Sequence, residues 1–216
     1  MKKGILMTLP KSDDVTEYLA VFSKEIIDKC LEYSVKIKLL EKDSASKKIF
    51  EEMLKSLNFN MIVFNGHGSP DKILGHKNQE IIKLGVNENL LIDRIVYARS
   101  CWCLSGIGEN KKIKNQNGCF IGYRIPFMFL MDTTRATTPN KDKTAKIFFQ
   151  TSNMVPLGLI KGHTALESHE NSKKSMLKAI KKNLRERDNN SQAIAETLWN
   201  NYVSQDLIGN KDVRLI

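Results

Sequence analysis

Short apolar runs separated by amphipathic stretches fill the first half of the chain, and this alternation constrains the fold more than any other feature. One run alternates apolar with polar side chains and the others are continuous, a pattern typical of strands covered by helices. We therefore predict five strands, at residues 4–9, 35–40, 61–64, 95–98 and 119–123. Two shorter runs, at residues 73–74 and 81–84, are expected to pair as a hairpin.

Amphipathic helices are predicted between the first strands. Residues 12–14 supply a serine cap and two first-turn acids, and apolar side chains then recur at three- and four-residue steps from Val15 to Cys30. This spacing predicts one long helix. A second such stretch, at 49–57, ends near Asn58. Because strands and helices alternate, we predict an α/β fold with a mostly parallel sheet of about five or six strands, flanked by helices.

The second half of the chain is predicted to be helical. Helical patterns begin at about Asp142, with breaks at Gly162 and at the polar residues 187–190. No repeat, low-complexity segment or long linker divides the chain. We therefore expect a single domain over 1–216, in which 186–216 form a C-terminal helical extension.

Composition excludes several protein classes. The chain has 216 residues, of which 41% are hydrophobic and 27% charged, as in ordinary globular proteins. No apolar run approaches the roughly 18 residues that span a bilayer, and the apolar part of the N-terminal segment is too short for a secretory signal. Four irregularly spaced cysteines do not suit a disulfide scaffold, so we expect reduced thiols and a cytoplasmic location.

The net charge of +10 raises the possibility of a nucleic-acid partner. The lysines are spread over the whole chain, and the densest groups carry almost no interleaved aromatic residues for stacking on bases. We therefore expect a solvated basic face and no nucleic-acid site. An acidic protein partner is equally compatible with this charge.

Two reactive side chains follow two predicted strands. His67 comes after the strand at 61–64, between two glycines that leave its ring approachable, and Cys101 comes shortly after the strand at 95–98. In parallel sheets, such ends meet at the edge where ligands bind. A histidine can take the thiol proton, and the thiolate is the stronger nucleophile. The backbone N–H groups of Gly68 and Cys101 are candidate donors to the oxyanion of a tetrahedral intermediate.

The remaining cysteines and histidines suggest other roles. Cys30 on a helix face and Cys119 in a strand are expected to be core thiols. A zinc site built from Cys101, Cys103 and nearby histidines is the alternative, but the cysteine spacing is unusual and no second close pair exists. Glycine-rich phosphate loops are absent as well. We therefore expect neither a metal nor a cofactor.

The two motifs resemble those of the caspase-like (clan CD) cysteine peptidases, which include caspases, legumain, gingipain, clostripain, separase and the bacterial CHAT-domain proteases. Phe64–Ser69 and Ile95–Cys101 are most similar to the two catalytic motifs of the CHAT group, and Cys119–Tyr123 resembles the strand that follows them. The resemblance covers about residues 1–180 and is specific only at the two motifs. It implies a caspase-like fold in which His67 accepts a proton from the cysteine nucleophile.

The resemblance leaves the choice of nucleophile open. Counting along the strand from Ile95 places Cys101 at the catalytic position, whereas the Cys103–Gly106 stretch is similar to the corresponding segment of legumain and separase. The second register would place Arg99 and Ser100 inside a buried strand, which is costly for polar groups. We therefore favour Cys101, and expect its pKa to be depressed by His67.

Substrate recognition is the least constrained part of the prediction. Several relatives accept a basic P1 residue through a pocket carboxylate, and Asp132, after the fifth strand, is the candidate here; the alternative is a loop carboxylate or a partner of Arg135. The resemblance implies a cysteine endopeptidase that cleaves a protein substrate through a covalent thioester, with any regulator on a separate chain. The alternative is a catalytically silent caspase-like module that docks an acidic protein partner.

Overall fold

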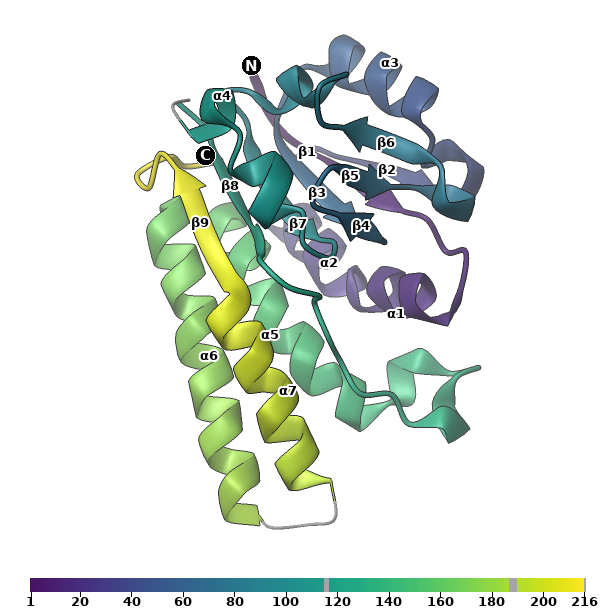
Figure 1. Ribbon diagram of the computed structural model, residues 1–216, viewed down its shortest axis with the longest axis vertical. Coiled ribbons are helices and arrows are strands. Elements are labelled where there is room, and N and C mark those ends of the chain that lie inside the picture. Colours follow the sequence, from purple (N-terminus) through teal and green to yellow (C-terminus); the bar gives the residue numbers. More distant parts are fainter. Residues whose placement is uncertain (115–116, 187–189, 216) are drawn as a thin grey trace.

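A six-stranded sheet forms the centre of the computed structural model, which describes residues 1–114, 117–186 and 190–215 (Figure 1). The strand order is β2-β1-β3-β7-β8-β9; the first five are mutually parallel, and β9 is antiparallel to β8. The strands are β1 Lys2–Leu9, β2 Ile37–Glu41, β3 Phe59–Asn65, β7 Ile95–Arg99, β8 Cys119–Tyr123 and β9 Gln205–Gly209. The predicted α/β class and the mostly parallel sheet are confirmed.

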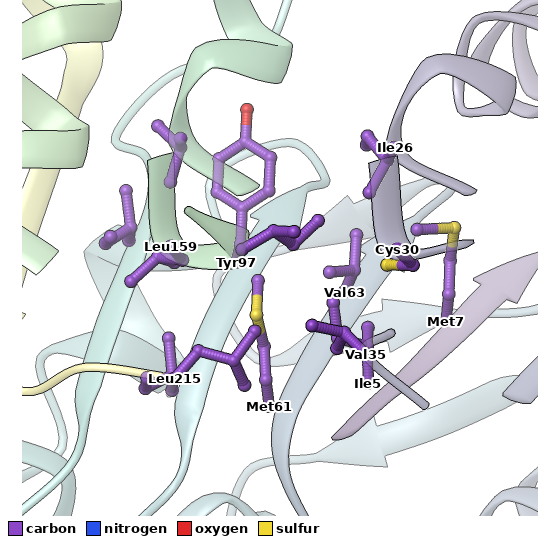
Figure 2. Packing of buried hydrophobic residues seen from close by; sticks show 14 of the residues in the cluster. Ile5, Met7, Ile26, Cys30, Val35, Met61, Val63, Tyr97, Leu159 and Leu215 are labelled. Carbon is purple, nitrogen blue, oxygen red and sulfur yellow. The ribbon is translucent and has the colours of Figure 1, made fainter. Parts of the chain in front are cut away.

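Both faces of this sheet are covered. On one face, side chains such as Ile5 and Val63 pack with Ile26 and Cys30 of a helix (Figure 2). The opposite face packs against a helix at residues 47–57 and a small antiparallel sheet. Because neighbouring residues of a strand point to opposite faces, a strand buried on both sides is apolar throughout. This accounts for the continuous runs in the sequence.

The helices are α1 Asp14–Phe22, α2 Lys24–Glu32, α3 Lys47–Leu57, α4 Lys111–Lys114, α5 Lys143–Ile160, α6 Ala165–Glu186 and α7 Ser191–Ser204. The expected single helix from Val15 to Cys30 is wrong, because the chain divides at Ser23 into α1 and α2. The Ser23 hydroxyl donates to the Leu19 carbonyl at 2.7 Å, a back-bond that bends helices. The apolar spacing continues across this bend and therefore did not reveal it.

The expected hairpin is present in the small sheet, whose strands are β4 Gly68–Ser69, β5 Lys72–Leu74 and β6 Glu80–Lys83. Ile73 pairs with Ile82 in antiparallel register. The expected helix break at Gly162 also occurs, where this residue has a φ of 87° between α5 and α6. Of the other expected break, at 187–190, residues 187–189 lie outside the described residues.

The segment 186–216, expected to be a helical extension, also supplies the sixth strand. β9 directly follows α7 and pairs along the whole of β8, from Tyr123 opposite Gln205 to Cys119 opposite Gly209. Its sequence is short and contains polar residues, so the apolar pattern does not identify it. In the described part of the chain, no helix is both long and apolar enough to cross a membrane.

Two leucines test the buried arrangement of the helices. Leu54 of α3 is 2% exposed, whereas Leu31 of α2 is 70% exposed. Leu54→Ala should lower the free energy of unfolding by about 2–5 kcal/mol, because it removes buried surface and leaves a cavity. Leu31→Ala, the same change on an exposed face, should alter it by less than about 0.5 kcal/mol. Urea unfolding followed by circular dichroism measures both; equal effects would contradict the packing of α3.

Candidate functional site

The carboxyl ends of β3 and β7 lie side by side and carry the two predicted catalytic residues. Asn65 of β3 is in register with Arg99 of β7, so His67 and Cys101 leave the sheet at the same edge. The two following loops touch closely. A Cβ atom on Gly68 would lie 3.2 Å from the carbonyl oxygen of Cys101 and 3.0 Å from the Cβ of Ser100. Glycine at this position allows the loops to approach.

His67 has a carboxylate partner, Asp13, which the sequence analysis treated only as a first-turn acid of a helix capped by Ser12; the structure places the cap on Asp13 instead. The Nε2 atom of His67 lies 2.7 Å from Oδ2 of Asp13, and 35% of the His67 side chain is exposed. Asp13 is the N-cap of α1, where its Oδ1 accepts hydrogen bonds from the backbone N–H and the hydroxyl of Thr16. The first turn of α1 therefore places a carboxylate against the imidazole. The capping pattern was visible in the sequence, but nothing in it indicated the contact with His67.

The electrostatics of Asp13 favour its charged form. Partial burial alone would raise its pKa, but hydrogen bonds from Thr16 and from His67 outweigh burial and hold the pKa below the usual value. An ionised carboxylate beside an imidazole orients the ring and stabilises the imidazolium that forms when the ring accepts a proton. The second ring nitrogen of His67, Nδ1, is then the candidate acceptor for a proton from a reacting group.

Cys101 and Cys103 occupy different environments. Cys101 is partly exposed, whereas Cys103 is fully buried and its Sγ donates to the Ser100 carbonyl at 3.1 Å. Burial raises the pKa of Cys103 to about 12. It also raises the pKa of Cys101, although a backbone hydrogen bond from Phe127 acts in the opposite direction. The expected depressed pKa of Cys101 is therefore wrong for this structure, because desolvation outweighs the groups that stabilise the thiolate.

Gly68, the predicted oxyanion donor, lies at the start of the small sheet. It pairs with Ile73 of β5, immediately after His67, and its Cα is crowded by the Cys101 loop. The structure therefore brings this backbone to the same sheet edge as His67 and Cys101. Its role as a donor to an oxyanion stays a prediction.

Asp132 lies on an exposed loop after β8. Its Oδ1 accepts from the backbone N–H and the hydroxyl of Thr134, at 3.0 and 2.7 Å, and so caps a short 3₁₀ helix at Thr133–Arg135. The Thr134 hydroxyl and backbone hydrogen bonds lower the pKa of this carboxyl. Phe127, in the same segment, gives a backbone hydrogen bond to the Cys101 thiol, so this segment passes close to Cys101. The predicted role of Asp132 in substrate binding stays a prediction.

A buried aspartate, which the sequence analysis named only as the start of the helical half, holds this loop. Asp142 is 1% exposed and caps α5 by accepting from the Ala145 N–H at 2.9 Å. Its other oxygen accepts from the Tyr18 hydroxyl at 3.0 Å and from the Asp132 backbone N–H at 2.8 Å. Asp142 thus ties the loop after β8 to α1 and α5.

Arg99, the last residue of β7, is fully buried at the base of the site. Its Nε donates to Oδ1 of Asn65 at 2.8 Å and its guanidinium lies 5.7 Å from the centre of the Phe149 ring. Its terminal nitrogens donate to Oδ1 of Asn153 and to the Ser23 hydroxyl, both at 2.8 Å. These neutral acceptors replace the hydration of the guanidinium. Burial of Arg99 in β7 is therefore not by itself an argument against Cys103 as the nucleophile, although the sequence analysis used it as one. The burial of Cys103 is what distinguishes the two cysteines.

Metal ligation has no support in the described parts of the chain, where no group of three or more histidine, cysteine, aspartate or glutamate side chains is placed to hold an ion. His76, considered for a zinc site, has other contacts. Its Nδ1 lies 2.6 Å from the Pro10 carbonyl oxygen and its Nε2 lies 3.4 Å from Oδ1 of Asp43. His76 therefore fixes the segment that leads into Asp13.

Comparison with known proteins identifies the fold. No family model matches the chain, and no curated protein matches it. Among solved structures, the complex of Porphyromonas gingivalis RgpB pro- and mature domains aligns with 99% of this chain at a TM-score of 0.59 and 10% identity. The Arg specific cysteine proteinase gingipain R (RgpB) aligns with 98% at a TM-score of 0.56 and 11% identity.

The chain spans about half the length of these neighbours, 49% of the first and 47% of the second. The likeness extends over the six-stranded sheet and the helices, including the C-terminal ones. The chain therefore has the caspase-like fold of the gingipain cysteine proteinases.

The lowered pKa of Asp13 predicts a pH-dependent contribution to stability. A carboxyl whose pKa is lower in the folded than in the unfolded state stabilises the fold above the unfolded pKa, and this stabilisation is lost as pH falls through the folded pKa. Asp13→Asn should therefore be less stable than the wild type at about pH 6, and the difference should shrink below about pH 4. Urea unfolding at several pH values measures it. Asp14→Asn, the exposed next residue, is the control; a difference independent of pH in Asp13→Asn would contradict the ionised cap.

Proposed function

We propose that this protein is a cysteine endopeptidase in which Cys101 is the nucleophile and His67 the general base. One observation carries the proposal: adjacent parallel strands bring a histidine with a carboxylate partner and a partly exposed cysteine to one edge of a caspase-like sheet. Two of its structural neighbours are cysteine proteinases, which supports the same chemistry here. We also propose that the substrate is a protein, that any regulator is a separate chain, and that the protein is cytoplasmic.

The reaction follows from the groups at this edge. His67 takes the proton from the Cys101 thiol as the sulfur attacks the scissile carbonyl carbon, and the N–H groups of Gly68 and Cys101 donate to the resulting oxyanion. The tetrahedral intermediate collapses to a thioester while the imidazolium gives its proton to the leaving amine. His67 then removes a proton from water as the water oxygen attacks the thioester carbonyl carbon; the C–S bond breaks, the acid product leaves, and His67 returns the proton to the Cys101 sulfur. Asp13 keeps the ring oriented and stabilises its charged form.

The raised pKa of Cys101 defines how this dyad works. A protonated thiol is a weak nucleophile, so the proton moves to His67 as the sulfur attacks. Cys103 is a poorer candidate, because its sulfur is buried and already donates to the Ser100 carbonyl.

A second candidate function is favoured by the same thiol. A caspase-like module that docks a partner needs no reactive cysteine, and burial of Cys101 keeps its pKa above the usual value. Iodoacetamide labelling of the native protein, followed by mass spectrometry, distinguishes the two. The peptidase predicts that Cys101 reacts much faster than the buried Cys30 and Cys119 and that His67→Ala slows its labelling markedly; a Cys101 rate that is unchanged in His67→Ala favours the module.

The dyad is tested by three substitutions. Cys101→Ala should abolish cleavage of an unstructured protein substrate, and His67→Ala should lower kcat/KM by about 10⁴-fold or more, because the nucleophile loses its base. Cys103→Ala is the matched control and should retain activity within about ten-fold, because its buried sulfur does not reach substrate. Circular dichroism confirms that each variant is folded. An active Cys101→Ala with an inactive Cys103→Ala would show that the strand register is wrong.

Asp132 is proposed to bind a basic P1 side chain. It lies five residues beyond Phe127, whose N–H contacts the Cys101 thiol, and its carboxyl is held in the ionised form by Thr134. Asp132→Asn keeps the helix cap, because asparagine caps as well as aspartate, but removes the charge. It should lower kcat/KM for P1 arginine peptides by about ten-fold or more and leave apolar P1 peptides unchanged. A set of fluorogenic peptides that differ only at P1 measures this; an unchanged arginine preference would exclude the role.

A further inference from the structure

A basic groove runs between α5 and α6, on the face of α6 that α7 does not cover. Its volume is about 960 Å³. Five cationic side chains of α6 line it: Lys174, Lys178, Lys181, Lys182 and Arg185. Lys174, Lys178, Lys181 and Arg185 recur at three- and four-residue steps, and Lys182 lies beside them, so the five form one stripe along the helix, about 16 Å long at 1.5 Å per residue.

Most of this positive charge is not neutralised within the protein. Lys174 pairs with Glu170, and Lys182 pairs with Glu186, both on exposed helix surface. In the described parts of the chain, no carboxylate lies within ion-pair distance of Lys178, Lys181 or Arg185. The stripe therefore presents a field that attracts an anionic partner.

The floor of the groove is apolar. Ile147 of α5 and Leu177 and Ala179 of α6 are partly buried side chains that pack on the core cluster of α5, α6 and α7 and also line the groove. No aromatic side chain is among the described residues that line it. Apolar contacts under a rim of cations suit an amphipathic acidic segment, whereas bases of a nucleic acid would need aromatic surfaces to stack on.

We propose that the groove between α5 and α6 binds an acidic, amphipathic segment of a partner protein, with its carboxylates on the stripe and its apolar side chains on the floor. The lining residues of α6 belong to its C-terminal half, which extends past the sheet at the end where the parallel strands finish (Figure 1). A segment bound there would hold the rest of its protein near the candidate site. Binding itself does not depend on Cys101 being a nucleophile.

Fluorescence anisotropy with a labelled synthetic peptide tests the proposal. The probe is a helical peptide of about 14 residues, with glutamates on one face and leucines beside them. The protein is Cys101→Ala, so that peptide binding is measured without cleavage, whatever the fate of the proposed activity. The variant Lys178→Glu/Lys181→Glu, made in this background, should bind the peptide about five-fold or more weakly.

The matched control is Lys47→Glu/Lys48→Glu, which makes the same change in net charge on exposed residues of α3. It should bind within about two-fold of the parent protein. A peptide in which serines replace the leucines should bind more weakly than the probe, because it cannot use the apolar floor. The proposal is overturned if both lysine variants weaken binding equally, or if the serine peptide or a thymidine oligonucleotide of similar charge binds as tightly as the probe.

Discussion

The buried guanidinium of Arg99 is the interaction on which the arrangement of the site depends. Removing a charge from water costs several kcal/mol unless hydrogen bonds replace its hydration. Here the replacements come from Asn65 on β3, from Ser23 between α1 and α2, and from Asn153 on α5. Asn153 also donates to the carboxylate of Glu25 at 2.8 Å, which connects the buried cation to an anion on α2. One side chain thus holds two strands, the bend between two helices and a third helix in a single arrangement.

This position explains why the catalytic candidates come together. Asn65 precedes His67 by two residues and Arg99 precedes Cys101 by two, so the hydrogen bond between them fixes the starting points of both loops. The carboxylate that meets His67 comes from the other end of α1, whose last turn leads into Ser23. The geometry of the site is therefore set from beneath by a polar cluster, while the loops above it are tied by Asp142 and His76.

The sequence predicted the elements whose pattern is local. The five parallel strands, the hairpin and the helical C-terminal half follow from apolar spacing and turn residues, and the strand ends placed His67 and Cys101 at one edge. The features that it missed depend on contacts distant in sequence. β9 is a strand only because β8 offers an edge, the bend at Ser23 depends on a hydroxyl back-bond, and Asp13 meets His67 across 54 positions. The shift in the Cys101 pKa could not be predicted either, because burial is a property of the whole fold. At about 10% identity, the chain still adopts the gingipain fold.

The antiparallel strand β9 has a consequence for the order in which the chain folds. Gln205 and Tyr123, which face each other at the start of this pairing, are 82 positions apart, and three helices lie between them. Contacts of such long range form late, because ordering the intervening chain is slow. Until then, the five parallel strands present β8 as an open edge with unpaired backbone groups, which neighbouring molecules can also pair with. Pairing of β9 with β8 therefore closes the edge through which the partly folded sheet can pair with other molecules.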